Sequence, residues 1–406
     1  MDGETLAPTV LEHRRGLPSV CRPAPREPGG APLSARFAPA AAPRLVVKIG
    51  SSLLVGSDGA VRRDWLASVL ADIATRRAAG QQVAIVSSGA IALGARRLGL
   101  AKGGRASLED AQAAAACGQI ELARTYAELL GHHDTVAAQI LLTLGDLEDR
   151  RRYLNVAATL DRLLSLGAVP VLNENDSVAT QEIRFGDNDR LAARAAQAAQ
   201  AGAVILLSDI DGLYTANPRL DPAATLIPAV ERIADVAHMA DGTSASGLGS
   251  GGMAAKVQAA RIAVQAGIHL AVVDGRADHP LQRFDSTGHG TVFVAEGGAS
   301  ARKAWLAGRL TVAGRLTIDA GAAAALGRGS SLLAAGVVTV EGEFARGDAV
   351  AVIAGGTVIA RGLVAYDATE ARAIAGVRSD AQAPILGYAP RSAIIHRDQL
   401  VLVAGT

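Results

Sequence analysis

A glycine-rich stretch followed by a lysine is the part of the chain best suited to hold phosphate. Four glycines lie among residues 247–252, and Met253 opens an alanine-rich segment of helical composition. Glycines let the backbone curl with its N–H groups inward, and the positive end of a helix attracts an anion. Lys256 would lie on the first turn of that helix. No glycine directly precedes Lys256 and no Ser or Thr follows it, so the stretch departs from the Walker pattern, and a flexible linker is the alternative.

The use of lysine in this chain supports a chemical role for two positions. Of the 40 basic residues, four are lysines and the others are arginines. Lys48 and Lys256 each lie beside glycine-containing turns. Because lysine is a compact point charge, it suits a phosphoryl oxygen that moves during reaction better than the planar guanidinium of arginine does.

Polar residues follow several apolar strands at the point where each strand is expected to end. These turns are 50–52 (Gly-Ser-Ser), 87–89 (Ser-Ser-Gly), 173–176 (Asn-Glu-Asn-Asp) and 208–209 (Ser-Asp), with 186–190 (Gly-Asp-Asn-Asp-Arg) before a helix. Each turn alone has an ordinary interpretation as a helix cap or a loop. Since ligands gather at the carboxyl ends of parallel strands, their shared position predicts one polar site at one sheet edge.

The elements that must position these residues alternate between strands and helices. Short apolar runs predict strands at 45–49, 83–86, 136–142, 169–172, 204–207 and 268–273, and helical spacing predicts helices near 66–73, 153–166, 191–200 and 253–266. This alternation predicts an α/β fold, a three-layer sandwich with a mainly parallel central sheet. After residue 312 short runs at 337–340, 349–353, 357–360 and 400–403 predict a separate small β-rich domain.

Composition excludes several other classes of protein. The chain has 406 residues, which suggests two domains, and its net charge of +1 argues against broad binding to nucleic acid or anionic membrane. Two cysteines without metal-type spacing predict no disulfide framework and a reducing, cytoplasmic location. The scattered histidines and the absence of a Gly-x-Ser-x-Gly elbow favour neither zinc nor hydrolysis, and no apolar run is long enough to span a membrane.

The first 42 residues are expected to form a disordered extension. They hold seven of the 15 prolines and show neither helical nor strand periodicity. A transit peptide is the alternative, but Glu4, Glu12, Glu27 and the prolines oppose an amphipathic helix.

Taken in order, six motifs resemble the glutamate 5-kinase branch of the amino acid kinase family. They are Val-Val-Lys-Ile-Gly-Ser-Ser-Leu-Leu (46–54), Val-Ser-Ser-Gly-Ala-Ile (86–91), Asn-Glu-Asn-Asp-Ser-Val (173–178), Gly-Asp-Asn-Asp (186–189), Ser-Asp-Ile-Asp-Gly-Leu-Tyr (208–214) and Gly-Ser-Gly-Gly-Met-Ala-Ala-Lys (249–256). The resemblance covers about 44–392. It implies an amino acid kinase domain over 43–300 and a PUA-like domain over 313–392.

The resemblance implies ATP-dependent phosphorylation of the side-chain carboxylate of L-glutamate, the first step of proline biosynthesis, with ATP and Mg²⁺ as cofactors. It implies that Lys48 and Lys256 neutralise the phosphoryl group in transit and that Asp189 orients both lysines. The residues that it assigns to glutamate are Ser88, Asp176 and Asn188. Those that it assigns to ATP are Lys48, Ser208, Asp209, Ser250, Gly251, Gly252, Met253, Ala254, Ala255 and Lys256.

The residues of the chain agree with that reaction. A side-chain carboxylate is already ionised at pH 7, so its attack on the γ-phosphate needs no general base, and the absence of a well-placed histidine fits. Two positions depart from the family pattern: Ser250 replaces a common Thr, and Ala255 stands where Thr or Ser often precedes the lysine. The lost hydroxyl would change ATP affinity more than the identity of the reaction.

Several alternatives stay open at this point. Another amino acid kinase, acting on N-acetylglutamate or aspartate, is the nearest, although N-acetylglutamate lacks the ammonium group that Asp176 would pair with. An RNA-binding protein acting through the PUA-like domain is the alternative from another class, with Arg328, Arg346, Arg361 and Arg391 as candidate contacts. The resemblance also implies a homo-oligomer (dimer or tetramer), feedback inhibition by proline and hand-off of the product to glutamyl phosphate reductase.

Overall fold

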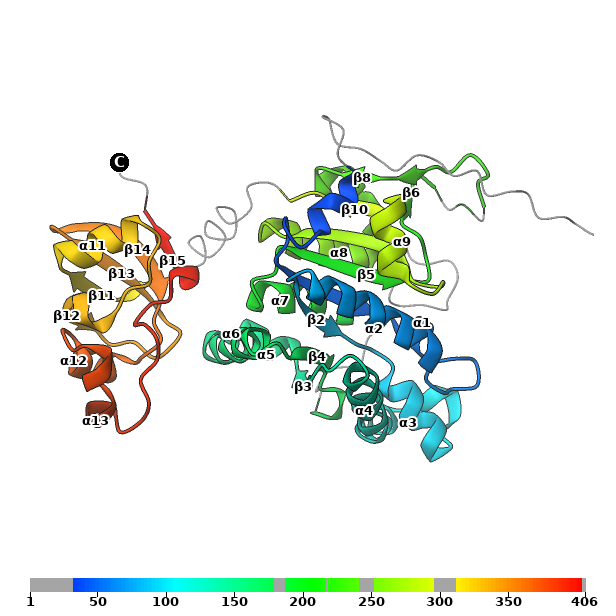
Figure 1. Ribbon diagram of the computed structural model, residues 1–406, viewed down its shortest axis with the longest axis horizontal. Helices are drawn as coiled ribbons and strands as arrows, with labels where there is room; N and C mark the ends of the chain where they lie inside the picture. The colour runs from blue at the N-terminus through cyan, green and yellow to red at the C-terminus, as the bar shows by residue number, and fades with distance from the viewer. Residues whose placement is uncertain are drawn as a thin grey trace, which may run out of the picture.

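The chain folds into two units, which we call the N-terminal unit (up to residue 295) and the C-terminal unit (from residue 312) (Figure 1). The computed structural model describes residues 32–178, 187–216, 218, 220–240, 252–295 and 312–403.

The N-terminal unit is built on one sheet of eight strands in the order β3-β4-β2-β1-β5-β9-β10-β8. The strands from β3 to β9 run parallel, and β10 lies antiparallel to β9. The strand bounds are β1 (Arg44–Ile49), β2 (Gln82–Val86), β3 (Ala137–Leu142), β4 (Val169–Glu174), β5 (Ala203–Ser208), β8 (Ala229–Val230), β9 (His269–Asp274) and β10 (Thr291–Phe293). A two-stranded ribbon, β6 (Leu213–Tyr214) with β7 (Leu226–Ile227), follows β5.

Helices cover both faces of this sheet (Figure 1). The α-helix bounds are α1 (Ser51–Leu54), α2 (Arg63–Ala78), α3 (Ala90–Leu98), α4 (Leu108–Gly131), α5 (Leu144–Glu148), α6 (Arg150–Ser165), α7 (Asp187–Ala198), α8 (Met253–Gln265) and α9 (Pro280–Thr287). The 3₁₀ turns are η1 (Leu33–Phe37), η2 (Ala101–Gly104), η3 (Asp176–Val178) and η4 (Ile233–Ala240). The predicted three-layer α/β sandwich is therefore confirmed.

Two separate hydrophobic cores lie on the two faces of the sheet. Successive residues of a strand contribute to different cores, because the side chains of a strand alternate between its faces. On β1, Val47 packs with α2 and α9, whereas Val46 packs with α7 and α8. On β5, Ile205 and Leu206 divide in the same way. Both faces are buried, so the central strands are continuous apolar runs, as expected for a parallel sheet covered by helices.

Helices α3 and α4 cross at unusually close range. A Cβ atom at Gly94 would lie 1.8 Å from the backbone oxygen of Ala114, and one at Gly118 would lie 1.9 Å from that of Ala90. Only glycine leaves room for this contact of the two backbones. Since Ala90 is the first residue of α3, the crossing fixes the start of that helix against α4.

Residues 32–42 correct the expectation of a disordered extension up to residue 42. Phe37 is fully buried and packs edge-on against Phe284, with ring centroids 5.4 Å apart. Its carbonyl oxygen accepts hydrogen bonds from Arg76 and Gln81 at 2.9 and 3.0 Å. The buried contact with Phe284 and the two hydrogen bonds to the Phe37 carbonyl outweigh the proline-rich composition that suggested disorder. Residues 1–31 lie outside the described residues.

The C-terminal unit is a five-stranded sheet in the order β12-β11-β13-β14-β15 with its own hydrophobic core. Its strands are β11 (Val312–Ile318), β12 (Val337–Gly342), β13 (Ala349–Ala354), β14 (Thr357–Leu363) and β15 (Leu400–Leu402). Its α-helices are α11 (Ala320–Gly327), α12 (Ala368–Ile374) and α13 (Ala383–Leu386), and its 3₁₀ turns are η5 (Ala334–Gly336), η6 (Ser379–Ala381) and η7 (Arg397–Gln399).

Four of these strands match predicted runs, but β11 was missed. Gly314, Arg315 and Thr317 interrupt its apolar residues and weaken the signal, although β11 lies between β12 and β13. Across the described parts of both units, no helix is long and apolar enough to cross a bilayer.

The α3–α4 crossing predicts a stability difference between two glycines of one helix. Gly118→Ala should lower the free energy of unfolding by about 2 kcal/mol or more, since an added methyl group must push two backbones apart. Gly131→Ala, at the open end of α4 where nothing lies within 4 Å, should change it by less than about 1 kcal/mol. Urea unfolding of both variants is the measurement; equal effects would contradict the close crossing.

Candidate active site

A buried carboxylate between two lysines lies at the carboxyl edge of the central sheet. Asp189, near the start of α7, has a side chain that is only 1% exposed. The Nζ atom of Lys48 on β1 lies 2.7 Å from its Oδ1, and the Nζ atom of Lys256 on α8 lies 3.1 Å from its Oδ2. The three residues come from separate elements and meet at this edge. We call them the Lys–Asp–Lys cluster.

The charges of this cluster are coupled strongly. Burial by itself would raise the pKa of the Asp189 carboxyl, but the charges of Lys48 and Lys256 and their hydrogen bonds reverse this, so that its pKa lies below the ordinary value. Asp189 is therefore ionised at neutral pH. Two cations then face one anion in a nearly dry environment, and the remaining positive charge favours a further anion at this place.

The turn before α3 is fixed from two sides. The hydroxyl of Ser87 lies 3.0 Å from that of Tyr126 on α4, and both side chains are buried. Burial raises the pKa of Tyr126, although the hydrogen bond with Ser87 opposes this. Gly89 has φ of +102°, a left-handed conformation that favours glycine and lets the chain turn into α3. Ser88 is thereby held at the edge of the sheet.

Asn188, next to Asp189, connects this turn to the end of β4. Its amide nitrogen donates hydrogen bonds to the hydroxyl of Ser88 at 2.7 Å and to the side-chain oxygen of Asn173 at 3.3 Å. Its own side-chain oxygen is buried and accepts no hydrogen bond within the described residues. An unsatisfied buried acceptor is costly, so it suits a ligand that donates an N–H group.

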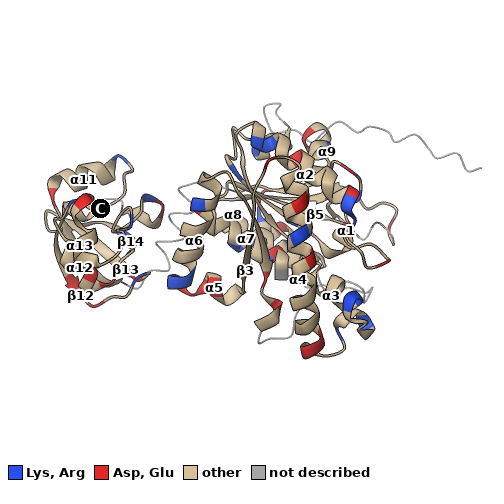
Figure 2. Ribbon diagram, turned by 60° about the horizontal axis from the view of Figure 1, so that its bottom comes forward, with Lys and Arg blue, Asp and Glu red and all other residues tan. Residues whose placement is uncertain are grey.

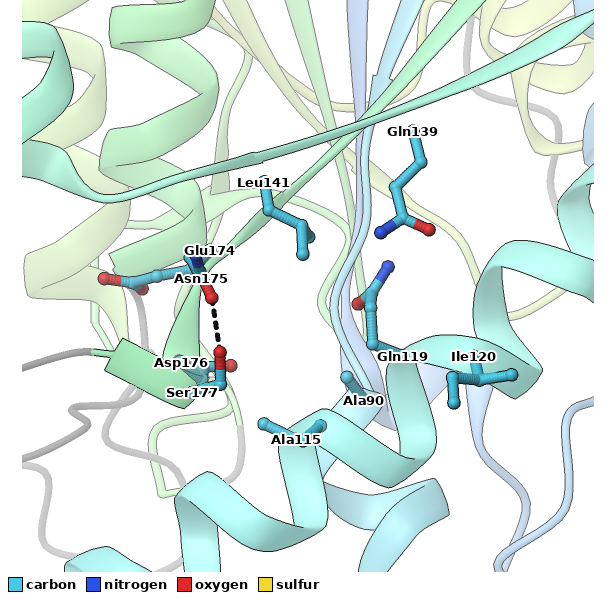
Figure 3. Close-up of a pocket in the computed structure, with 11 residues that line it drawn as sticks. Ala90, Ala115, Gln119, Ile120, Gln139, Leu141, Glu174, Asn175, Asp176 and Ser177 are labelled. Carbon is cyan, nitrogen blue, oxygen red and sulfur yellow. Dashed lines mark hydrogen bonds between the residues drawn. The ribbon is translucent and has the colours of Figure 1, made fainter.

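A cavity of about 260 Å³ opens beside Asp176, between α4, β3 and the end of β4 (Figure 3). Figure 3 shows Gln119 and Gln139 pointing toward each other on one side of the cavity, with Asp176 and Ser177 on the other. Its lining residues are Ala90, Ala115, Ala116, Gln119, Ile120, Gln139, Leu141, Glu174, Asn175, Asp176 and Ser177. Asp176 therefore faces a space suited to a small ligand, whereas Ser88 and Asn188 are not part of its lining.

Most of the residues predicted to bind ATP lie within the described part of the chain. Ser208 is buried at the end of β5 and its hydroxyl donates to Asp209 at 3.2 Å, while Asp209 itself is exposed. Gly252 precedes α8 without a side-chain cap, and Met253, Ala254, Ala255 and Lys256 form the first turn. The helix start thus offers backbone N–H groups next to the Lys–Asp–Lys cluster, a suitable place for phosphate. Ser250 and Gly251 lie outside the described residues.

The donor set at the edge does not form a metal cage of its own. In the part of the chain that the structure describes, no group of three or more His, Cys, Asp or Glu side chains could hold a metal ion. The Asp189 carboxylate already forms ion pairs with two lysines. This arrangement fits Mg²⁺ only as the ion is usually held beside nucleotides, through phosphate oxygens and water with few protein ligands.

Comparison with known proteins agrees with this geometry. Residues 43–274 match the model of the amino acid kinase family, and residues 314–384 match that of the PUA domain. The chain belongs to the amino acid kinase family. It therefore uses ATP as its phosphoryl donor, and the C-terminal unit is a PUA domain.

Similar curated proteins carry one name. The chain is 67% identical over 369 residues to the glutamate 5-kinase of Sphingopyxis alaskensis, covering 90% of this chain and 99% of that protein. It is 62% identical to the glutamate 5-kinase of Novosphingobium aromaticivorans (89% and 96% covered) and 60% identical to that of Zymomonas mobilis (90% and 93% covered).

Gln119 was missed by sequence reasoning. Its side-chain oxygen accepts a hydrogen bond from the amide nitrogen of Asn173 at 2.9 Å. This bond orients the Asn173 side chain, whose oxygen accepts a hydrogen bond from Asn188. Gln119 lies in the middle of α4, 54 positions from Asn173. No local pattern marks it, because the contact depends on how α4 packs against the sheet.

The Lys–Asp–Lys cluster predicts unequal costs for its members. Asp189→Ala should lower the free energy of unfolding by about 3–5 kcal/mol, since it removes the buried carboxylate that both lysines contact. Lys48→Ala leaves a balanced pair of Asp189 with Lys256, and should cost less than about half as much. Guanidinium unfolding of both variants is the measurement, with Asp235→Ala, from an exposed ion pair, as the control that changes little.

The difference in the free energy of unfolding between the parent protein and Asp189→Ala should also depend on pH. Because the pKa of Asp189 is lowered on folding, the stability from its ion pairs is intact above the unfolded-state pKa of about 4 and is lost as the pH falls through the folded-state value. The difference between the parent protein and Asp189→Ala should be constant near neutral pH and should shrink in acid. Equal costs for Asp189→Ala and Lys48→Ala, or no acid dependence, would contradict the proposed balance of charge.

Proposed function

We propose that the protein transfers the γ-phosphoryl group of ATP to the side-chain carboxylate of L-glutamate, giving L-glutamyl 5-phosphate, the first step of proline biosynthesis. The observation that carries the proposal is the buried Lys–Asp–Lys cluster at the carboxyl edge of the parallel sheet, with an excess positive charge beside the start of α8. The glutamate 5-kinases at 60–67% identity support the choice of substrate.

The reaction needs charge neutralisation more than proton transfer. A carboxylate oxygen of glutamate forms a bond to the γ-phosphorus, and the bond from that phosphorus to the bridging oxygen of ATP breaks, releasing ADP. Both reactants are anions, so the barrier comes largely from their repulsion and from alignment. Lys48 and Lys256 oppose that repulsion from two sides, and Asp189 holds both ammonium groups in place.

We assign the amino acid to the sheet edge that runs from the cavity beside Asp176 to the turn that holds Ser88 and Asn188. Asp176 is 9% exposed and faces the cavity, where it can pair with the α-ammonium group. The side-chain oxygen of Asn188, which accepts no hydrogen bond among the described residues, supplies a second acceptor for the same group. Ser88 and the start of α3 supply donors for a carboxylate. N-acetylglutamate lacks the charged ammonium group with which Asp176 would pair.

We assign the phosphates of the nucleotide to the start of α8, where they would meet backbone N–H groups, Lys48 and Lys256. Ser208 and Asp209 at the end of β5 are assigned to the nucleotide as well. Ser250 and Gly251 are included on the resemblance alone. Mg²⁺ would be bound by the phosphate oxygens and would reduce their charge. Ala255 offers no hydroxyl, so the backbone N–H groups and the lysines would bind the phosphates without it.

Three further properties are part of the proposal. Self-association is supported by the position of β3 at the edge of the sheet among the described strands, and by Val136, which directly precedes β3 and is 70% exposed. Inhibition by proline and hand-off of the acyl phosphate to glutamyl phosphate reductase rest on the resemblance to glutamate 5-kinases. A cytoplasmic location is supported by the low cysteine content, with Cys117 as a free thiol.

The reaction is tested by trapping the acyl phosphate with hydroxylamine in the presence of ATP and Mg²⁺. Hydroxamate should form with glutamate and not with N-acetylglutamate or aspartate. Lys48→Ala and Lys256→Ala should each reduce turnover at least about 100-fold, since each removes a cation from the transferred group. Circular dichroism serves as the folding control. Product with another acid would overturn the substrate, and normal turnover of either folded variant would overturn the role of that lysine.

Asp176→Asn tests the ammonium contact separately. It should raise the apparent KM for glutamate at least about tenfold, because a charged hydrogen bond is lost, while the KM for ATP stays within about twofold. Steady-state kinetics with each substrate varied in turn is the measurement. An unchanged glutamate KM, or an equal rise for ATP, would remove Asp176 from the amino acid site.

A further inference from the structure

Three arginines gather where the C-terminal unit meets the N-terminal unit. Arg346 lies between β12 and β13, Arg391 follows α13, and Arg151 lies on the first turn of α6. Arg346 is close enough to the other two for their charges to act on it. Across the described residues, none of the three guanidinium groups forms a hydrogen bond or an ion pair. We call them the arginine cluster.

Two of these guanidinium groups are partly withdrawn from water. The Nε atoms of Arg346 and Arg391 are buried and find no hydrogen-bond acceptor in the described structure. Burial lowers the pKa of Arg346 most, the charges of Arg391 and Arg151 lower it further, and Tyr388 and Glu370 only partly offset this. Like charges with unpaired buried donors destabilise a fold unless an anion joins them.

The nearby acid is already engaged. The carboxylate of Glu370 accepts a hydrogen bond from the backbone N–H of Asp367 at 3.3 Å and one from the hydroxyl of Tyr388 at 2.8 Å. Glu370 thus caps α12, and its oxygens are directed to that helix and to Tyr388. Among the described residues, no carboxylate forms an ion pair with the arginine cluster, and the charge of Glu370 only partly offsets the repulsion at Arg346.

The backbone between β12 and β13 rests directly on α6. Gly347 has φ of +93°, and a Cβ atom there would lie 3.1 Å from the backbone carbon of Arg150 and the backbone nitrogen of Arg151. In Figures 1 and 2, α6 is the helix of the N-terminal unit that faces the C-terminal unit. An anion held by the arginine cluster would therefore contact both units.

We propose that the arginine cluster binds the phosphate group of a small ligand, either inorganic phosphate or a phosphomonoester, and so links the PUA domain to the kinase domain. The planar fork of arginine matches phosphate oxygens through paired hydrogen bonds. A polynucleotide fits less well, since it needs an extended basic stripe with stacking aromatics, and the exposed acids Glu341 and Glu343 lie on or directly after β12.

Binding is tested on the full chain with its nucleotide site saturated by a non-hydrolysable ATP analogue and Mg²⁺, which keeps the probes out of that site. Inorganic phosphate and phenyl phosphate are titrated by calorimetry at constant ionic strength. One saturable site is expected. Arg346→Gln, Arg391→Gln and Arg151→Gln should each weaken binding at least about tenfold, because each removes charged hydrogen bonds. Arg361→Gln, an exposed arginine on β14, is the matched control and should bind as the parent does.

Thermal unfolding separates binding from folding. Without phosphate, Arg346→Gln and Arg391→Gln should unfold at the parent temperature or above it, since each variant relieves repulsion; with phosphate, only the parent and Arg361→Gln should gain stability. Binding of phenyl phosphate but not of phosphate would identify a phosphomonoester site, and the reverse a phosphate site. The proposal would be overturned if no saturable binding were seen, or if Arg346→Gln or Arg151→Gln bound as the parent does. It would also be overturned if neither small probe bound while a single-stranded RNA bound in a way that needs these arginines.

Discussion

The burial of the Asp189 carboxylate is the constraint on which the arrangement of the site depends. A charge with 1% exposure is stable only beside opposite charges, so β1, α7 and α8 must meet where Lys48 and Lys256 reach it. The cluster holds one cation more than it holds anions. Its electrostatics therefore favour the folded chain together with a bound anion, which ties the stability of the kinase domain to the ligand that it is proposed to use.

A second constraint is steric and acts on the substrate side. The contact of Gly94 and Gly118 with the backbone of the facing helix leaves no room for a side chain, so α3 can start at only one distance from α4. That distance sets where Ser88 lies relative to Asn188, and α4 also carries Gln119 to Asn173. Charge and close packing thus fix two neighbouring parts of one sheet edge.

Sequence reasoning succeeded where the signal was local. Apolar runs such as that of β5 identified the central strands, and the polar turns after them, which include Asp176 and Ser208, predicted one polar site at one edge, since parallel strands end together. It failed for Gln119, because the contact with Asn173 depends on how α4 packs against the sheet, and no short window of residues contains that contact. It failed for β11 because Gly314, Arg315 and Thr317 interrupt the apolar residues of the strand and weaken its local signal.

The ordered segment around Phe37 shows that a domain boundary drawn by sequence similarity and one drawn by packing need not coincide. The match to the kinase family begins at residue 43, yet Phe37 fills a place in the core beside Phe284 and satisfies two buried donors. A shortened chain that begins at Pro43 would keep every family motif. It would also leave an open hydrophobic cavity and the Arg76 and Gln81 donors without the Phe37 carbonyl. The shortened chain would therefore be less stable, and an alignment of motifs would not show why.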